Sequence, residues 1–305
     1  MNAHVSEFEP ALADRRARPR KPYRTRRRAL ERVRLLGEAV DLIRPEEVMH
    51  HVQAWVADGR KAMVANHNLN SMKLVREHDG MRRFYDRADM IELDSTPLIW
   101  FARLIGLHSR PLHRCTYLDW REHFWSVANR LGWKVMYVGG APGVAETAVA
   151  NVAARYPGAR IQARHGYFDM RPGSAENASV VAEVKAFAPD ILFVGMGMPR
   201  QEAWIMSNLN ALPNCVIFSV GAAFDYEAGV QKSAPRWMGK AGLEWLYRLA
   251  CDPKRLARRY LYEPWALMPR ILADVGQAAA RRVKPQRPQT RSAPIPAGPP
   301  KPVGR

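Results

Sequence analysis

The sequence has little cysteine and no long apolar run. Its 3 cysteines, Cys115, Cys215 and Cys251, are far apart and form no CxxC pair. A disulfide framework or a cysteine-based zinc site is therefore not expected, and a reducing compartment fits best. No apolar run approaches the roughly 18 residues that a membrane-spanning helix needs. The N-terminal arginines also lack the apolar segment of a secretory signal.

Acidic residues are scarce at both ends of the chain. The net charge is +18, and residues 1–34 hold eleven basic and four acidic residues. Residues 276–305 hold seven basic residues, seven prolines and no acid. Such compositions bury too little apolar surface to fold, so we expect a disordered basic arm over 1–34 and a disordered tail over 276–305. Residues 35–235 are about neutral.

Strong positive charge has two common partners, nucleic acid and an anionic membrane surface. The neutral middle of the chain offers no basic face, so a nucleic-acid-binding protein is the weaker alternative. Residues 236–275 combine basic residues with Trp and Tyr, which suits a lipid headgroup region. We therefore expect a basic helical appendage over 236–275, interrupted at Pro253, that binds an anionic membrane surface. A merely solvated charged helix is the alternative.

Short apolar runs alternate with helical patterns between the two ends. This alternation predicts an α/β fold, a Rossmann-like, mainly parallel sheet with helices on both faces. The strand-like runs are 37–43, 61–66, 88–93, 134–140, 159–166, 190–197 and 215–224. The helical patterns are 45–58, 70–84, 96–106, 119–131, 143–155, 174–188 and 199–210. Ligands of such sheets bind beyond the carboxyl ends of the strands.

Glycine-rich turns follow two of the strand-like runs. Gly139 and Gly140 begin "GGAPGVAE", and Gly195 begins "GMGMPRQE". Such turns let a backbone approach a ligand, and the following helix N-terminus suits a diphosphate, although plain turns are the alternative. The first turn is not GxGxxG, and no strand-end acid follows about twenty residues later, which argues against a dinucleotide-dependent oxidoreductase.

Acidic residues also follow strand-like runs. Asp94 lies where a general base would lie, or it caps a helix, and the residues alone leave both open. Asp225 either accepts a hydrogen bond from a nucleoside or caps a turn. The pairs Glu92/Asp94 and Asp225/Glu227 have the spacing of some metal-binding acids, but such pairs are common by chance. We expect neither a metal nor another cofactor.

Several segments together resemble the WecB/TagA/CpsF family of bacterial glycosyltransferases. They include "YVGGAPGVAE", "HGYFD", "PDILFVGMGMPRQEAW", "VGAAFDYEAG" and "SAPRWMGKAGLEWLYRL", in family order over roughly residues 35–262. The resemblance implies a metal-independent, inverting transfer of a sugar from a UDP-sugar to a polyprenyl-diphosphate-linked sugar. It places the reaction at the cytoplasmic membrane face, in wall polymer, capsule or exopolysaccharide synthesis.

The resemblance also assigns roles to matched positions. Asp94 takes the position of the catalytic base, with Asn66 where many members have Thr. The implied donor-binding residues are Asn68, Arg114, Gly139, Gly140, Tyr167, Gly195, Gln201 and Asp225. Arg248, Arg255 and Arg258 match basic residues of the appendage that covers the site at the membrane and binds the acceptor diphosphate.

Three positions depart from the family pattern. Ser95 and Tyr117 each replace a Gly, and Asn66 replaces the Thr. These positions lie near the sugar pocket that the family implies, so the donor sugar, the acceptor sugar and the linkage stay open. Oligomeric state, including a homo-oligomer, also stays open.

Overall fold

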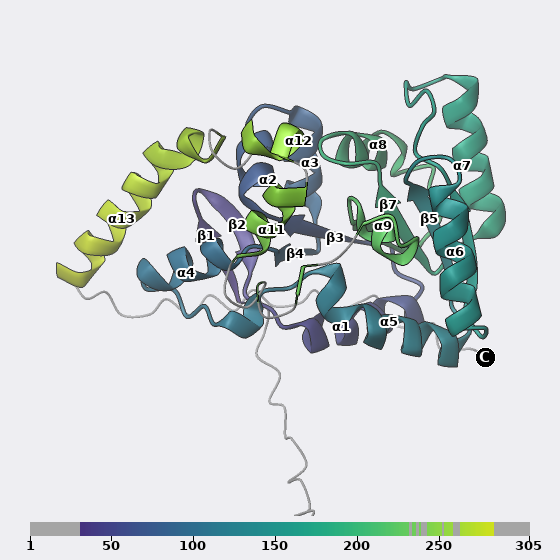
Figure 1. Cartoon of the computed structure of the whole chain (residues 1–305), viewed down its shortest axis with the longest axis horizontal. Coiled ribbons are helices and arrows are strands. Elements are labelled where there is room, and N and C mark those ends of the chain that lie inside the picture. Colours follow the sequence, from purple (N-terminus) through teal and green to yellow (C-terminus); the bar gives the residue numbers. More distant parts are fainter. Residues whose placement is uncertain are drawn as a thin grey trace, which may run out of the picture.

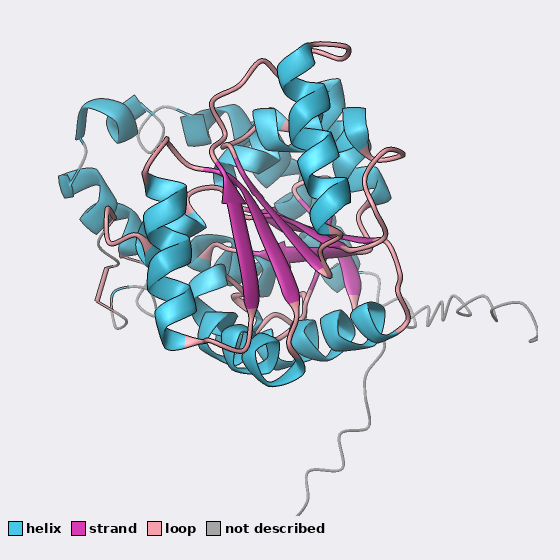
Figure 2. Ribbon diagram, turned by 90° about the vertical axis from the view of Figure 1, so that its right-hand side faces the viewer, coloured by secondary structure: helices cyan, strands magenta, loops and turns pink. Residues whose placement is uncertain are grey.

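A sheet of six parallel strands forms the centre of the structure, a computed structural model (Figures 1 and 2). It describes residues 31–231, 234–235, 238, 243–251, 253–258 and 263–283. The strand order is β4-β3-β8-β7-β5-β6, and every neighbouring pair is parallel. The strands are β3 (Ala62–His67), β4 (Met90–Leu93), β5 (Lys134–Gly139), β6 (Arg160–Arg164), β7 (Ile191–Gly195) and β8 (Val216–Ser219).

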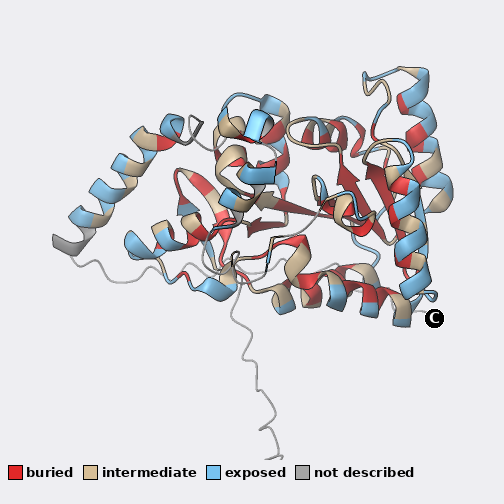
Figure 3. Cartoon of the chain, viewed as in Figure 1, coloured by how far each residue is buried: buried red, intermediate tan, exposed pale blue. Residues whose placement is uncertain are grey.

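Helices cover both faces of this sheet, which confirms the predicted fold class. One face packs against α1 (Pro45–Ala57), α5 (Tyr117–Leu131), α6 (Val144–Arg155) and α9 (Ala223–Glu227). The other packs against α3 (Asp79–Arg87), α7 (Ala175–Phe187) and α8 (Arg200–Asn208). Figure 3 shows the buried residues concentrated in the strands and the helix faces turned toward them.

The apolar composition of the strands explains why the sheet is central. Every residue of β7 and of β8 is buried, as expected for parallel strands that are covered on both faces. The helix ends have local causes as well. Ser174 caps α7 by accepting a hydrogen bond from the Asn177 amide, and Gly132 ends α5 in a left-handed conformation.

A separate two-stranded hairpin corrects two predictions. Strand β1 (Arg32–Leu35) lies partly within the predicted disordered arm, and β2 (Glu38–Asp41) pairs with it antiparallel instead of joining the central sheet. The cause is the buried carboxylate of Asp41. It accepts two hydrogen bonds from Arg32, both 2.9 Å, and one from the Ile91 amide of β4 at 2.7 Å. The rest of the predicted arm lies outside the described residues.

The hairpin turn also holds the C-terminal part of the chain. Leu36 and Gly37 both have positive φ, 53° and 85°, which is strained for Leu. The Leu36 amide donates to Asp274 at 2.7 Å, and its carbonyl accepts from Arg76 at 2.8 Å. Asp274 belongs to α13 (Met268–Val283) and holds the turn against that helix, whereas Arg76 holds it against the segment between β3 and β4.

A third apolar cluster joins this hairpin to its neighbours. It includes residues of β1, β2 and α4 (Thr96–Leu104), together with Met72 of α2 (Leu69–Leu74) and Leu267 of η3 (Glu263–Leu267). The start of α13 packs on the same cluster through Ile271, while its far end extends away from the body (Figure 1). The C-terminal elements therefore lie beside the helix that follows β3.

Three further boundaries differ from the prediction. The predicted helix over 70–84 is divided into α2 and α3 where Arg76 reaches the hairpin turn. The predicted strand over 215–224 ends at Ser219, and α9 begins at Ala223 because the chain turns back over the sheet. Residues 276–283, predicted as disordered, continue α13, and residues 284–305 lie outside the described part.

Candidate functional site

The carboxyl ends of all six parallel strands meet at one edge of the sheet, where ligands of this architecture bind. Asn66 lies there near the end of β3, and Asp94 directly follows the neighbouring strand β4. Asn66 is the register partner of Glu92, and the Asp94 amide donates to the His67 carbonyl at 2.8 Å. The structure thus brings together the ends of β3 and β4, which lie far apart in the sequence.

Asp94 lies beside Arg114. The Arg114 Nη2 atom is 4.0 Å from Asp94 Oδ1, and its Nη1 is 3.6 Å from Asp119 Oδ2. The side chains of Asp94 and Arg114 are 30% and 17% exposed, so the pair is partly screened from water. Ser95 occupies the N-cap position of α4, and its own side chain makes no capping hydrogen bond. Two residues that the sequence placed in the site are therefore neighbours.

Glu92 is a buried carboxyl group below Asp94, and the sequence analysis did not place it among the candidate site residues. Its Oε1 accepts from Cys115 Sγ at 3.2 Å and Trp120 Nε1 at 3.1 Å, and its Oε2 accepts from Asn66 Nδ2 at 3.3 Å. Burial raises the pKa of Glu92 to about 7, with a further contribution from the charge of Asp94. The acid-x-acid spacing of Glu92 and Asp94 is the available sequence signal, and it does not indicate by itself that Glu92 is buried.

The two residues after Asn66 have local structural partners. His67 is buried, stacks on Tyr85 and contacts Ser71 Oγ through Nδ1 at 2.9 Å. Burial lowers the pKa of His67 to about 3, so the ring is neutral at physiological pH. The Asn68 side chain accepts from the Ser71 amide at 3.1 Å and caps α2. Its predicted role in donor binding stays a prediction.

The predicted glycines lie where strand ends approach each other closely. A Cβ atom on Gly139 would lie 2.4 Å from the Gly195 carbonyl oxygen, and one on Gly195 would lie 2.4 Å from that of Gly221. Gly140 has φ +67°, and its amide donates to the Gly195 carbonyl at 3.2 Å. Larger residues would push these strand ends apart, so the glycines have a packing cause in addition to their predicted contact with a diphosphate.

Gln201 is buried in the first turn of α8. Its Oε1 accepts from the Gly221 amide at 3.1 Å, and its Nε2 donates to Glu202 Oε1 at 2.7 Å. Gln201 therefore connects α8 to the turn after β8. Its predicted contact with the donor diphosphate stays a prediction, as does that of Tyr167, which is 66% exposed in the loop after β6.

Glu202 gives a prediction on stability and pH. Its carboxyl group is fully buried, Oε2 has no partner among the described residues, and burial raises its pKa from 4.5 to about 7. Between these values the unfolded chain loses the proton while the folded chain keeps it, so the free energy of unfolding falls as pH rises. We expect Glu202→Gln to stabilise the protein by about 2 kcal/mol more at pH 8 than at pH 5.

Urea unfolding at both pH values measures this difference. Glu46→Gln, at an exposed position of α1, is the matched control and should change stability equally at the two pH values. An equal effect of Glu202→Gln at pH 5 and pH 8 would show that the buried carboxyl group is not the cause.

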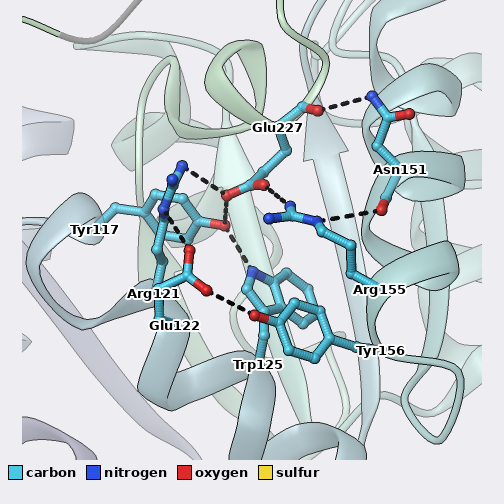
Figure 4. Close-up of polar contacts among 8 residues, drawn as sticks. All are labelled: Tyr117, Arg121, Glu122, Trp125, Asn151, Arg155, Tyr156 and Glu227. Atoms are coloured by element: carbon cyan, nitrogen blue, oxygen red, sulfur yellow. Dashed lines mark hydrogen bonds and ion pairs between the residues drawn. The ribbon is translucent and has the colours of Figure 1, made fainter.

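Asp225 lies in the first turn of α9. Glu227, at the end of the same helix, holds it in place through the contacts drawn in Figure 4. The buried Glu227 carboxylate accepts from the Tyr117 hydroxyl at 2.9 Å and Arg121 Nη1 at 3.3 Å, and it pairs with Arg155. These partners come from α5 and α6. Asp225 thus stays a candidate site residue at the sheet edge, whereas Glu227 holds α9 against α5 and α6.

The basic residues predicted to bind the acceptor lie in the C-terminal helices. Arg248 belongs to α11 (Glu244–Cys251) and Arg255 to α12 (Pro253–Ala257), but both side chains lie outside what the structure describes. Arg258 is exposed. A new helix begins at Pro253, where the interruption was predicted. The binding role of the three arginines stays a prediction.

A profile of the glycosyl transferase WecG/TagA/CpsF family matches residues 33–281. The chain belongs to this family. It is 31% identical over 209 residues to the N-acetylglucosaminyldiphosphoundecaprenol N-acetyl-beta-D-mannosaminyltransferase of Staphylococcus aureus strain NCTC 8325, covering 65% of this chain and 79% of that protein. The enzyme of the same name from strain MRSA252 is 30% identical over the same shares. The predicted family and the glycosyltransferase activity are confirmed.

Two properties of this glycosyltransferase concern the residues that the structure describes. None of their helices has both the length and the apolar character required to cross a membrane. Within the same part of the chain, no group of three or more His, Cys, Asp and Glu side chains has a metal-binding arrangement.

Proposed function

We propose that this glycosyltransferase moves a sugar from a UDP-sugar to a polyprenyl-diphosphate-linked sugar, with inversion at the anomeric carbon. The names of the S. aureus relatives support the acceptor, because they specify an undecaprenol-diphosphate-linked N-acetylglucosamine. The observation that carries the mechanism is the Asp94 carboxylate, 4.0 Å from Arg114 at the carboxyl edge of the sheet.

The reaction is a single displacement. The acceptor hydroxyl oxygen attacks the anomeric carbon of the donor sugar, and the bond between that carbon and the UDP oxygen breaks. Asp94 takes the hydroxyl proton as general base, and UDP leaves with the bonding electron pair. Attack opposite the leaving group inverts the anomeric centre.

The leaving UDP gains negative charge that the protein must stabilise. Arg114 supplies a fixed positive charge beside Asp94, and the N-termini of α6 and α8 follow the strands β5 and β7 at the same edge. Helix N-termini and arginines stabilise a diphosphate in this way without a metal ion. Asp225 and Tyr167 are the proposed contacts to the nucleoside.

An anionic membrane surface is the proposed location of the reaction, at the cytoplasmic face. Several apolar side chains support this location because they are exposed at one end of the molecule. Trp100 and Leu104 of α4 are 51% and 65% exposed, and Leu272 of α13 is 64% exposed. Both helices pack on the third apolar cluster, which includes residues of the hairpin β1–β2, and they lie at the same end of the molecule in Figure 1. Apolar and basic residues together suit a lipid headgroup region.

A donor screen tests the proposed function. The purified protein is incubated with UDP-N-acetylmannosamine, UDP-N-acetylglucosamine, UDP-glucose or UDP-glucuronic acid and a short-chain lipid-diphosphate N-acetylglucosamine. We expect one donor to increase the acceptor mass by one sugar residue, and UDP to raise the melting temperature, since a ligand that binds only the folded state stabilises it.

NAD and duplex DNA are the controls for the two alternative function classes, and neither should raise the melting temperature. A thermal shift with NAD and none with UDP would contradict the proposal. Transfer that EDTA abolishes and Mg²⁺ restores would contradict the metal-independent mechanism.

A further inference from the structure

Glu92 and Asn66 are directly opposite each other in the parallel pair β3–β4. Both side chains project toward the same face of the sheet, where Glu92 meets Trp120 of α5. Asp94 follows Glu92 by two residues, at the sheet edge. The buried carboxyl group of Glu92 is therefore placed directly below the proposed base, and it takes no part in the displacement itself.

The partners of Asn66 fix the orientation of its amide group. Nδ2 donates to Glu92 Oε2 at 3.3 Å and to the Cys115 carbonyl oxygen at 3.2 Å. The Cys115 carbonyl oxygen can only accept a hydrogen bond, so the amide nitrogen must face it. Its two hydrogens are then used, and Oδ1 is the polar atom of Asn66 that remains for a ligand. Among the residues that the structure describes, Oδ1 has no hydrogen-bond partner.

Cys115 connects this arrangement to the arginine of the site. Its thiol donates to Glu92 Oε1 at 3.2 Å, and its amide donates to the Leu93 carbonyl at 2.9 Å. Arg114 precedes it and forms a parallel bridge with Leu93. Glu92 therefore holds the Arg114–Cys115 segment against the end of β4, at the place where Arg114 lies 4.0 Å from Asp94.

We propose that Glu92 is a positioning residue of the transfer reaction, which holds Asn66 with its carbonyl oxygen available to a sugar hydroxyl or acetamido N–H and holds Arg114 beside Asp94. The proposal rests on the proposed function and adds a specificity element to it. Asn66 Oδ1 can only accept a hydrogen bond. The substrate group that it recognises must therefore be a donor.

The test begins with Glu92→Gln, which keeps the shape but supplies an amide nitrogen that conflicts with Asn66 Nδ2. We expect kcat to fall about 10- to 100-fold through loss of orientation. Glu46→Gln, at an exposed position of α1, is the matched control and should keep the wild-type kcat.

Rescue distinguishes positioning from a general loss of structure. In the Glu92→Gln background, Asn66→Thr replaces the amide with a hydroxyl, which can accept from the new amide or donate to it. We expect this double variant to recover part of the lost kcat. A double variant at least as impaired as Glu92→Gln alone, or a Glu92→Gln protein with wild-type kcat, would overturn the proposal.

A structural measurement separates this proposal from the proposed function. With ¹⁵N-labelled asparagine, the two Nδ2 protons of Asn66 should exchange slowly with solvent in the wild type and quickly in Glu92→Gln, with the resonance assigned by Asn66→Ser. Wild-type protein that transfers no sugar but shows this difference would contradict the proposed function alone. Fast exchange in the active wild type would contradict the role of Glu92.

Discussion

Replacement of Asp94 by Asn is expected to lower kcat by about 10²–10⁴-fold, the usual contribution of a general base. The amide has nearly the same shape as the carboxylate but cannot take the proton of the acceptor hydroxyl. This loss corresponds to roughly 3–5 kcal/mol of transition-state stabilisation. Turnover of the UDP-sugar identified by the donor screen, measured at saturating substrate, gives the value.

The binding of UDP distinguishes this effect from damage to the site. Asp94 contributes no positive charge, so Asp94→Asn should bind UDP at least as tightly as the wild type. Asp86→Asn, at an exposed position of α3, is the matched control and should turn over normally. Near-wild-type turnover of Asp94→Asn would mean that another group takes the proton.

The sequence was sufficient to place the six strands of the central sheet in order along the chain, because local patterns determine them. Buried parallel strands are apolar throughout, so runs such as β7 could be recognised without knowledge of their neighbours. The carboxyl edge followed from the architecture, and Asp94 was placed at it by its position after a strand. The pairing of Asp94 with Arg114 is consistent with the roles that the family resemblance assigned.

The missed features depend on contacts between distant residues. Glu92 accepts hydrogen bonds from Trp120 and Cys115, which lie 28 and 23 residues away in the sequence. No local pattern shows that a charged residue in a strand will meet such partners. The first hairpin was missed for the same reason, since Arg32 forms a strand only because Asp41 is buried beside β4.

Removal of both arginines that pair with Glu227, by Arg121→Ala and Arg155→Ala, is expected to lower the free energy of unfolding by about 3–5 kcal/mol. The Glu227 side chain is 1% exposed, and its oxygens face Arg121, Arg155 and the hydroxyl of Tyr117. Without the arginines a carboxylate stays buried with no positive charge beside it, and its desolvation is no longer compensated. Urea unfolding of the wild type and the double variant measures the loss.

Addition of Glu227→Gln to this double variant should recover much of the loss, because the buried charge is then removed while the Tyr117 hydroxyl keeps an acceptor. A triple variant as unstable as the double variant would assign the loss to packing of the arginine side chains instead.

The loss of these ion pairs should also affect function, because Glu227 belongs to α9. Asn151 donates to the Glu227 carbonyl at 2.9 Å, and Asp225 lies two residues earlier in the same helix. We therefore expect the double variant to bind UDP more weakly and the triple variant to regain affinity as α9 is held in place again.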